Sequence, residues 1–531
     1  MSNHAYESAA ALRPGSNGPI PISTLCERFS LAPASADDAA ALNDLSILGV
    51  SVDSGDTAPG ELFVGLPGFT AHGARFSDEA VGSGAVAVLT DADGALIAHE
   101  VAPGTPVLVH DDPRAVVGPL SAEVYHHPAR GLVTTAVTGT NGKTTTSYFL
   151  DAILSAHVGG CMVAGTVELR VGERSVESPR TTVEAPVLQR MMALAVEDKV
   201  GAASLEASSH AIVLHRLDGI VVDVAGFTNL QRDHLDFHKT MEGYLEAKAQ
   251  LFTPEHARRG VICVDDQWGA ALAAQAPIEV DRVRAYPGDA PADWWVSDAA
   301  VSLTDSATTF PLHGPDGEQI EASCPLPGLV NVQNAALSLV MAMRAGVPVD
   351  TAVAALATAH NIPGRMQRIT QRDGGRGTCI VDFAHTPDAM ELTLEAVRQI
   401  TPGRLIVVFG SDGDRDRGKR PMLGRVAARL ADVLVITDEN PRSEDPQTIR
   451  DAILEGVRSV RPDLADVEEI TTWRGDAVRR GVEICGPQDT VIVTGKGHEP
   501  FQEVAGEFIR YNDAPVMREA AEAKWGPVTP A

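Results

Sequence analysis

The sequence predicts an α/β protein of about three domains, at roughly 150 residues per domain. β-branched apolar runs of strand length recur along the 531 residues and alternate with segments whose apolar residues have helical spacing. Hydrophobic residues make up 44% of the chain, which is enough for several buried cores. We expect a disordered lead at 1–20, a first domain at 21–131, a central domain with a mostly parallel sheet at 132–362, and a C-terminal Rossmann-like domain at 363–531.

Composition excludes several classes of partner. Asp and Glu outnumber Lys and Arg by 71 to 43, a formal charge of −28, which argues against binding to nucleic acid or to an anionic membrane. No apolar run approaches the roughly 18 residues of a membrane span, and residues 1–21 lack the apolar segment of a signal peptide. The six cysteines include no C-x-x-C pair. We therefore expect a reduced cytoplasmic protein, acting as a monomer on small molecules.

The central domain opens with a strand, a glycine loop and a helix. The apolar run 132–137 leads into Thr-Gly-Thr-Asn-Gly-Lys-Thr-Thr-Thr at 138–146, and apolar residues at helical spacing follow at 147–154. Such a loop directs backbone N–H groups and a helix N-terminus at phosphate. Lys143 would reach the terminal phosphates, and the Thr144 hydroxyl would bind magnesium. The strict P-loop pattern fails because its first glycine falls on Val137, so a glycine loop without nucleotide is the alternative.

Other polar residues of the central domain have two interpretations each. Glu206 follows an apolar stretch and is either a magnesium ligand or a surface residue. The His and Asp residues of 233–238 are either metal ligands or helix caps. Lys248 lies within a predicted helix, and its local sequence indicates an ordinary solvated lysine. Asn331 and Asn334 precede a helical run at 335–345, where they would cap the helix or bind an adenine edge.

In the last third, three apolar strands (404–409, 431–437 and 490–494) each end in a loop with both charges. The carboxyl ends of parallel strands share one edge of a sheet, so we expect these loops to converge. Arg would bind a carboxylate and Asp or Glu an ammonium, which suits a zwitterionic ligand; three unrelated solvated loops are the alternative.

Together these motifs are similar to those of the Mur ligases, the ATP-dependent amide-forming enzymes of peptidoglycan synthesis. The similarity extends from about residue 47 to about residue 515 and rests on TGTNGKTTT, EASSH, FTNLQRDHLDFH, NIPGRM, VDFAHTPDA, GDRDRGKRP, ENPRSEDP and GKGHE. The loops with GDRD, NPRSE and GKGHE indicate the members that add the third residue to UDP-N-acetylmuramoyl-L-alanyl-D-glutamate. The resemblance also implies domain closure, with a hinge near 363–364.

The resemblance implies a role for each group of residues. ATP would be bound by Gly139, Thr140, Asn141, Gly142, Lys143, Thr144, Thr145, Asn331 and Asn334. Two Mg²⁺ ions would be held by Thr144, Glu206, His234 and a carbamylated Lys248, and the catalytic set would be Lys143, Glu206, His234 and Lys248. The UDP-MurNAc-dipeptide, bound in part by the N-terminal domain, would contact Val52, Ser54, Phe69, Thr70, Ala71, Thr181, Thr182, Ser208 and Arg216. The incoming amino acid would contact Arg415, Glu439, Asn440, Pro441, Arg442, Gly495 and Glu499.

The chain departs from the family pattern at Gly55, Arg180, Cys263 and the loop 410–415, and at Glu439 an Asp-Asn-Pro-Arg signature becomes Glu-Asn-Pro-Arg. Arg442 would pair with the distal carboxylate of meso-2,6-diaminopimelate, a group that L-lysine lacks. We therefore expect diaminopimelate as the third residue. The alternatives are L-lysine, a folylpolyglutamate-synthetase-like ligase, and a nucleotide-binding relative without catalysis.

Overall fold

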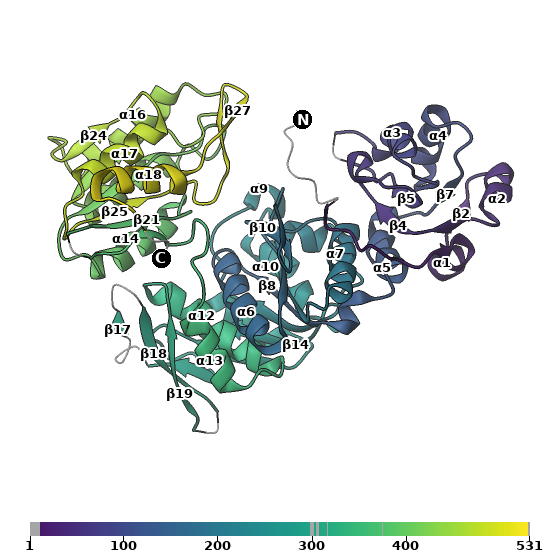
Figure 1. The fold of residues 1–531 in the computed structure, drawn as a ribbon, viewed down its shortest axis with the longest axis horizontal. Helices are drawn as coiled ribbons and strands as arrows, with labels where there is room; N and C mark the ends of the chain where they lie inside the picture. Colours follow the sequence, from purple (N-terminus) through teal and green to yellow (C-terminus); the bar gives the residue numbers. More distant parts are fainter. Residues whose placement is uncertain are drawn as a thin grey trace. The chain divides into compact units, whose positions relative to one another are not determined.

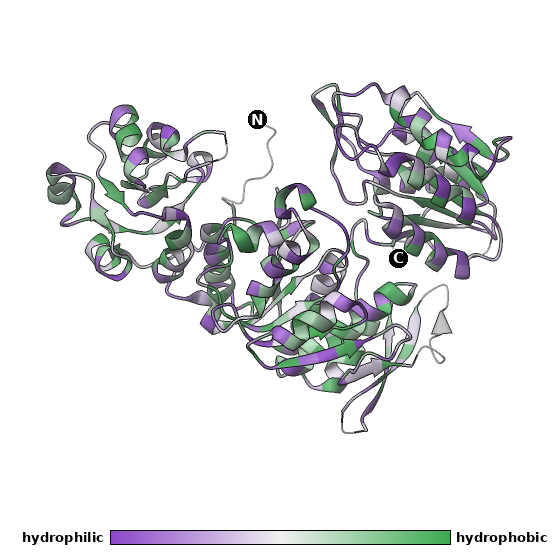
Figure 2. Cartoon of the chain, turned by 180° about the vertical axis from the view of Figure 1, so that it is seen from behind, coloured by the Kyte–Doolittle hydropathy of each residue, from purple (hydrophilic) through white to green (hydrophobic). Residues whose placement is uncertain are grey.

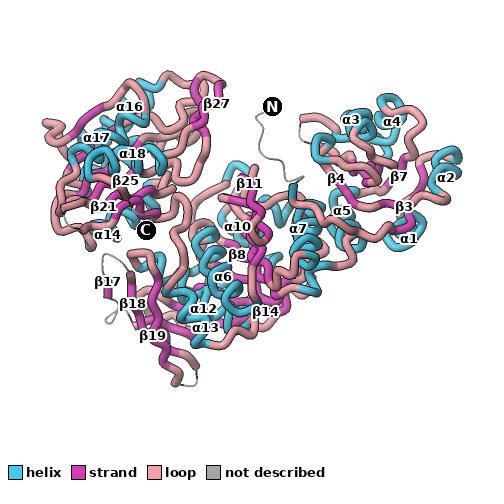
Figure 3. The backbone as a smooth tube through the Cα atoms, viewed as in Figure 1, coloured by secondary structure: helices cyan, strands magenta, loops and turns pink. Residues whose placement is uncertain are grey.

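The computed structural model describes residues 11–68, 70–297, 302–303, 307–315, 317–373 and 375–528. The chain forms two compact units, whose helices and strands are labelled in Figure 1. Unit 1 comprises Met1–Arg284, Gly288–Trp295 and Ala336–Ala355, and unit 2 comprises Ala285–Pro287, Val296–Ala335 and Leu356–Ala531. Helices and strands alternate along both units (Figure 3), which confirms the predicted α/β class.

The first part of unit 1 is a small α/β layer structure. Its five-stranded sheet has the order β2 (Ala32–Pro33), β7 (Val107–Val109), β6 (Ala87–Thr90), β5 (Glu61–Val64) and β4 (Gly49–Ser51), and β4 to β7 are parallel. Helices are α1 (Ile22–Phe29), α2 (Ala36–Leu42), α3 (Ser77–Gly82), α4 (Ala92–Val101) and α5 (Pro113–Val124), and β1 (Ile20–Pro21) pairs with β3 (Ser46–Ile47). Alternation along β5 sends Leu62 and Val64 into one core and Phe63 into another, so both faces of the sheet are buried.

Residues 11–19, which the sequence predicted to be disordered, are packed onto unit 1. Leu12 is fully buried in the core of the central sheet. The Arg13 guanidinium donates to the Glu61 carboxylate, and the Asn17 amide donates to the Leu48 carbonyl at 2.7 Å. The Gly- and Pro-rich composition hid one apolar anchor and these hydrogen bonds, so the predicted disorder is wrong for this stretch. Residues 1–10 lie outside the described residues.

The central sheet of unit 1 is mostly parallel, as predicted. Its strands run in the order β11 (Arg174–Glu177), β10 (Glu168–Val171), β9 (Cys161–Ala164), β12 (Ala202–Glu206), β8 (Val133–Thr138), β13 (Val222–Phe227), β14 (Ala257–Cys263), β15 (Val280–Arg284) and β16 (Trp294–Val296). Only the pairings of β10 with β9 and β11 are antiparallel among these described strands. Helices are α6 (Lys143–Val158), α7 (Ala185–Glu197), α8 (Ser209–Val213), α9 (Leu235–His238), α10 (Met241–Ala249) and α11 (Gln267–Gln275).

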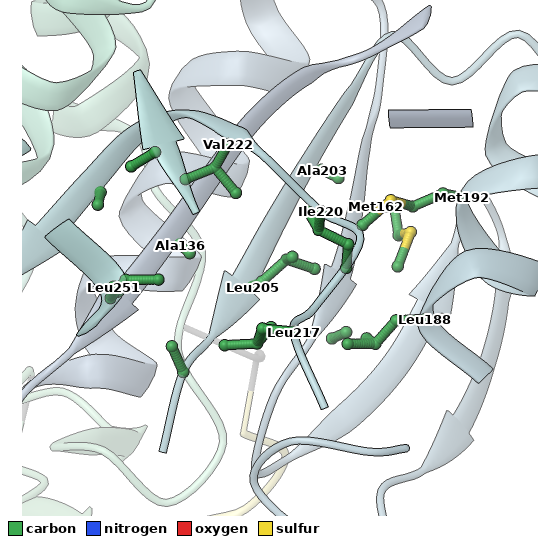
Figure 4. Packing of buried hydrophobic residues seen from close by; sticks show 14 of the residues in the cluster. Ala136, Met162, Leu188, Met192, Ala203, Leu205, Leu217, Ile220, Val222 and Leu251 are labelled. Carbon is green, nitrogen blue, oxygen red and sulfur yellow. The ribbon is translucent and has the colours of Figure 1, made fainter. Parts of the chain in front are cut away.

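The order of the central strands positions the site. Because β12, β8 and β13 are adjacent and parallel, Glu206 lies opposite Val137 and Phe227 opposite Thr138 at one edge. Beneath that edge, Ala136, Leu205 and Val222 pack in a core to which Leu188 and Met192 of α7 contribute (Figure 4). This packing holds the carboxyl ends of the three strands, and so the starts of the loops that follow them, in fixed positions.

Unit 2 contains a second parallel sheet. Its order is β20 (Gln367–Thr370), β21 (Thr378–Val381), β25 (Thr490–Val493), β22 (Leu405–Phe409), β23 (Val433–Ile436) and β24 (Val467–Glu469), with only β20 antiparallel among these strands. The helices are α14 (Pro387–Gln399), α15 (Lys419–Leu430), α16 (Pro446–Arg458), α17 (Arg474–Ile484) and α18 (Asp513–Trp525). The sheet strands are mostly hydrophobic whereas the helices have mixed faces (Figure 2), as expected for a sheet covered by amphipathic helices.

The remaining elements of unit 2 are antiparallel pairs and part of a long helix. Strand β18 (Thr308–His313) pairs with β17 (Ser302–Leu303) and β19 (Gln319–Cys324), and β26 (Phe501–Val504) pairs with β27 (Glu507–Arg510). Helix α12 (Leu329–Arg344) begins before Asn331, so Asn331 and Asn334 lie inside a helix that was predicted to start at Ala335; α13 (Val349–Ala357) follows. The Pro-Gly turn at 327–328 starts the helix early, and the Asn331 amide donates to the Pro327 carbonyl at 2.7 Å.

Candidate active site

The glycine loop of unit 1 connects β8 to α6 as predicted. Gly139 has φ +146°, and a Cβ there would lie 1.8 Å from the Thr228 hydroxyl oxygen, so only glycine fits. Gly142, at φ +88°, precedes the 16-residue helix α6 and offers it no side-chain cap. Lys143 Nζ donates to the carbonyls of Gly139 and Thr140, both at 2.9 Å, which holds its ammonium over the loop. A helix N-terminus and a lysine are thus directed at one point, an arrangement that suits nucleotide phosphate.

Glu206 lies directly beside this loop. Its side chain is buried, and the Thr144 hydroxyl donates to Oε2 at 3.1 Å. The backbone N–H and the hydroxyl of Thr166 donate to the same carboxylate at 2.8 and 2.9 Å. A carboxylate oriented against the Thr144 hydroxyl provides the oxygen ligands that Mg²⁺ prefers. The alternative of an exposed Glu206 is excluded by its burial.

Lys248 is buried, which excludes the interpretation of a solvated lysine. Its exposed fraction is 1%, Nζ donates to the Gly139 carbonyl at 2.9 Å, and the ammonium lies 4.5 Å from the centre of the Tyr244 ring. Burial, and secondarily the charge of Lys143, lower the pKa of Lys248 well below its ordinary value. Burial therefore favours the uncharged form of the Lys248 amine, which is the form that reacts with carbon dioxide.

His234 lies in the same region, in a left-handed backbone conformation with φ +52°. Its ring is 4.8 Å from that of His210 and 6.1 Å from that of Tyr244. Burial lowers the pKa of His234, and the charges of Lys143 and Lys248 lower it further against the opposing effect of Asp233. A neutral imidazole is the form that binds a metal ion. Within the described residues, no three His, Cys, Asp or Glu side chains cluster as a metal site.

A second group of candidates adjoins Glu206 on its other side. The Thr182 hydroxyl donates to the Glu206 carbonyl at 2.6 Å and accepts the Ser208 N–H at 3.0 Å. Arg216 donates to the Thr182 carbonyl at 3.1 Å and pairs with Glu184 at 2.9 Å, and the Thr181 hydroxyl oxygen lies 3.2 Å from that of Thr166. The structure therefore brings the four candidates of this group together with the magnesium candidate.

The remaining candidates of unit 1 follow the carboxyl ends of two neighbouring strands. Val52 and Ser54 come after β4, and Thr70 and Ala71 after β5, which is parallel to β4. The Ser54 hydroxyl donates to Glu79 at 2.8 Å. Phe69 lies outside the described residues.

In unit 2, the three mixed-charge loops converge as predicted, because β25, β22 and β23 are adjacent and parallel. Asn440 joins them: its amide donates to Asp412 Oδ1 at 3.0 Å and to Glu499 Oε2 at 3.1 Å. Lys496 Nζ donates to Asn440 Oδ1 at 2.8 Å. The interpretation as three unrelated solvated loops is therefore excluded.

Arg442 lies at the rim of these loops with φ +55°. Its guanidinium pairs with Glu503 at 2.6 Å and approaches Asp412 at 3.8 Å. Arg415, by contrast, is exposed and makes no hydrogen bond or ion pair with the described part of the chain. Pro441 is buried, and its carbonyl lies so close to Gly413 that a Cβ there would come within 1.9 Å.

Glu439 is a buried acid at the base of the same loops. Its exposed fraction is 3%, and a Cβ on Gly495, which has φ +110°, would lie 2.5 Å from Oε2. Burial, and after it the charge of Asp412, raise the pKa of Glu439 to about 8. The glycine thus makes room for a buried carboxyl group whose neutral form is favoured by burial.

Three family models match successive parts of the chain. The description "Mur ligase family, catalytic domain" matches residues 46–125, "Mur ligase middle domain" matches 137–342, and "Mur ligase, glutamate ligase domain" matches 364–497. The chain belongs to the Mur ligase family. It is therefore an ATP-dependent ligase of peptidoglycan synthesis.

Similar proteins cover nearly the whole chain of this Mur ligase. The UDP-N-acetylmuramoyl-L-alanyl-D-glutamate–2,6-diaminopimelate ligase of Streptomyces coelicolor is 42% identical over 515 residues, 97% of this chain and 99% of that protein. The UDP-N-acetylmuramyl-tripeptide synthetase of Leifsonia xyli subsp. xyli is 43% identical over 524 residues, with the same two coverages. A solved UDP-N-acetylmuramoyl-L-alanyl-D-glutamate–2,6-diaminopimelate ligase structure is 31% identical with a TM-score of 0.63, covering 90% of this chain and 95% of its own.

Three residues of the Mur ligase's C-terminal loops were not among the predicted site residues. Asp412, Lys496 and Glu503 all contact predicted ones. Asp412 and Lys496 stand within loops that the sequence had singled out, so their position on a shared strand edge could have identified them. Glu503 lies on strand β26, and no sequence signal connects it to Arg442. Among the described helices, none is long and apolar enough to cross a membrane.

Proposed function

We propose that this Mur ligase joins meso-2,6-diaminopimelate to UDP-N-acetylmuramoyl-L-alanyl-D-glutamate with ATP. The observation that carries the proposal is Arg442, a guanidinium at the rim of loops that also present the carboxylates of Asp412 and Glu499. Acidic groups attract the ammonium groups of a diamino acid, and the guanidinium suits its second carboxylate. Relatives at 42% and 43% identity are named as ligases of 2,6-diaminopimelate.

L-lysine is the second candidate for the third residue. The Leifsonia relative, at 43% identity, is named only as a tripeptide synthetase, without a stated third residue. Lysine has no second carboxylate for Arg442, whose charge would then be balanced only by Glu503 and Asp412. A folylpolyglutamate-type ligase is less well supported, because a Mur ligase model also matches residues 46–125 and the relatives cover 97% of the chain.

In the proposed reaction, residues of unit 1 activate the substrate carboxylate. Residues 139–145 would cradle the ATP phosphates. Asn331 and Asn334, which belong to unit 2, stay predicted adenine contacts. The γ-carboxylate of the D-Glu residue attacks the γ-phosphorus of ATP. This step forms an acyl phosphate and releases ADP. Lys143 disperses the charge that develops on the transferred group. The amine of the third amino acid then displaces phosphate through a tetrahedral intermediate and closes the amide bond.

The residues around the loop fit divalent cations. Thr144, Glu206 and His234 would hold Mg²⁺, which neutralises phosphate charge when bound. Lys248 fits carbamylation because its amine is buried and its pKa is low. A carbamate would convert this position from an amine to a carboxylate and add an oxygen ligand beside the loop.

The test is phosphate release by the purified protein with ATP, Mg²⁺ and UDP-N-acetylmuramoyl-L-alanyl-D-glutamate. The third substrate is meso-diaminopimelate, L-lysine, L-ornithine or none. Release that depends on diaminopimelate, with the tripeptide product verified by mass spectrometry, is the expected result. A preference for lysine would overturn the assigned third residue, and no release with any amino acid would overturn the proposed ligase reaction.

A further inference from the structure

Lys496 is a buried cation that the proposed reaction does not yet use. Its exposed fraction is 0%, and it lies between the end of β25 and the start of β26. Nζ donates to Asn440 Oδ1 at 2.8 Å, to Glu499 Oε2 at 2.9 Å and to the Phe501 carbonyl at 2.6 Å. An ammonium has three protons, so each has an acceptor. The ammonium therefore has one fixed position.

That position determines which way the Asn440 amide points. Lysine can only donate, so the amide must present its oxygen to Lys496 and its NH₂ group to the neighbouring carboxylates. The NH₂ group donates to Asp412 Oδ1 at 3.0 Å and to Glu499 Oε2 at 3.1 Å, and the Glu503 N–H also donates to Oδ1 at 3.3 Å. A flipped amide would place an NH₂ group against the Lys496 ammonium.

The same contacts orient Glu499. Lys496 and Asn440 both bind Oε2, whereas Oε1 makes no hydrogen bond with the described part of the chain. The Glu499 side chain is 36% exposed although Lys496 is fully buried. The carboxylate is thus anchored from beneath by one oxygen and presents the other outward.

The geometry points to Lys496 as a positioning residue that sets the Asn440 amide and the Glu499 carboxylate to receive an ammonium group of the incoming amino acid. This inference rests on the proposed function, which places the amino acid at these loops. Lys496 does not itself touch the substrate in this assignment. Its charge also offsets Asp412 and Glu499, which would otherwise repel each other across Asn440.

Lys496→Met tests the assignment because it keeps the length of the side chain and removes all three donors. We expect the KM for diaminopimelate to rise about 10- to 100-fold, the range for lost hydrogen bonds to a charged group. The KM values for ATP and for the UDP-linked substrate should not change. In the double variant Lys496→Met/Asn440→Ala, the KM for diaminopimelate should be no higher than in the more impaired single variant. Both substitutions disrupt the same hydrogen-bonded arrangement of Lys496, Asn440 and Glu499.

Lys524→Met is a matched control within unit 2. Lys524 Nζ likewise donates to three acceptors, the carbonyls of Val482, Glu483 and Cys485, but these lie outside the amino-acid loops. Its loss should lower Tm without changing any KM. If Lys496→Met does not fold, Lys496→Gln, which retains an amide donor, takes its place in the same assays.

The outcomes separate this inference from the proposed function. A wild-type enzyme that does not use diaminopimelate contradicts the proposed function. A wild-type enzyme that does, combined with a Lys496 variant whose three KM values are normal or rise equally, overturns the positioning role alone. Additive losses in the double variant with Asn440→Ala would overturn it as well.

Discussion

The glycine loop of unit 1 (residues 139–145), which we propose binds phosphate, and the mixed-charge loops of unit 2, which we propose bind the amino acid, occupy equivalent places in their sheets, at the carboxyl ends of adjacent parallel strands. They are called the phosphate loop and the amino-acid loops below. The first is built largely from backbone, with glycines at φ +146° and +88° and a helix N-terminus. The second is built from side chains of both charges contributed by separate loops. A phosphate is recognised by N–H groups that any sequence provides, whereas an amino acid must be distinguished from close relatives.

The two regions should respond differently to the loss of a single side chain. In unit 1, Lys143 adds one charge to a loop whose shape is fixed by the backbone. In unit 2, removing the Asn440 side chain leaves two carboxylates without this donor, because Asp412 and Glu499 both accept from the Asn440 amide. Variants of the first region should therefore affect turnover, and variants of the second should affect the choice of substrate.

Lys143→Met should give the largest effect. Without the Lys143 ammonium the developing charge on the transferred phosphoryl group is less well stabilised, and kcat should fall by about 10³-fold or more. The measurement is steady-state phosphate release with all three substrates. Lys199→Met, which removes an exposed lysine of the same unit, is the control and should retain normal turnover. A Lys143 variant changed only in KM for the amino acid would contradict the division between the two regions.

Arg442→Ala should have a smaller but selective effect. Loss of the guanidinium removes the partner of the second substrate carboxylate and leaves Asp412 and Glu503 to repel it. We expect the KM for diaminopimelate to rise about 10- to 100-fold, with little change for ATP. Use of L-lysine relative to diaminopimelate should increase when the two amino acids are supplied together and the tripeptide products are quantified by mass spectrometry.

Glu503→Gln should have the opposite effect to Arg442→Ala on the availability of the Arg442 guanidinium. It releases Arg442 from the ion pair of 2.6 Å and leaves the guanidinium more available to the substrate. The KM for diaminopimelate should stay the same or fall. If both variants raise the KM for ATP and for diaminopimelate equally, Arg442 is not the group that reads the distal carboxylate.

The same contrast explains how much the sequence could predict. The phosphate loop is one contiguous run, so its strand, glycines and helix could all be predicted from 132–154. The pairs of the amino-acid site are separated by 28 residues for Asp412–Asn440, 56 for Asn440–Lys496 and 61 for Arg442–Glu503. Strand alternation predicted that the loops would meet, and this is confirmed, but not which side chains would pair.

The other differences between the sequence predictions and the structure have local physical causes. Lys248 has an unremarkable helical context, and only the fold shows that it is buried under the glycine loop. The helix α12 starts earlier than its composition suggested because Gly328, at φ +95°, permits the turn before it. The roles of Asn331 and Asn334 in binding ATP stay a prediction. Leu12 shows that a single apolar anchor can fix a Gly- and Pro-rich segment.

The smallest expected effect is a pH-dependent change in stability caused by Glu439, which lies at the base of the amino-acid loops. The pKa of Glu439 is raised to about 8 by burial and by Asp412, whereas an unfolded Glu titrates near pH 4.3. The folded state therefore holds a proton that the unfolded chain has released, and stability falls as pH rises from about 4.3 to about 8. Glu439→Gln removes this titration.

We therefore expect the Tm of Glu439→Gln to exceed that of the wild type by a margin that grows between pH 5 and 8 and then levels off. Each 1 kcal/mol corresponds to roughly 2–4 °C for a domain of this size, which thermal unfolding across that pH range can resolve. Glu444→Gln is the control of opposite sign. Hydrogen bonds from Arg420 and from the Asp414 N–H lower the pKa of Glu444 to about 2, so this variant should lose stability near neutral pH and approach the wild type as pH falls toward 2. A pH-independent difference for Glu439→Gln would mean that its carboxyl is ionised in the folded protein, and the protonated acid beneath Gly495 would have to be abandoned.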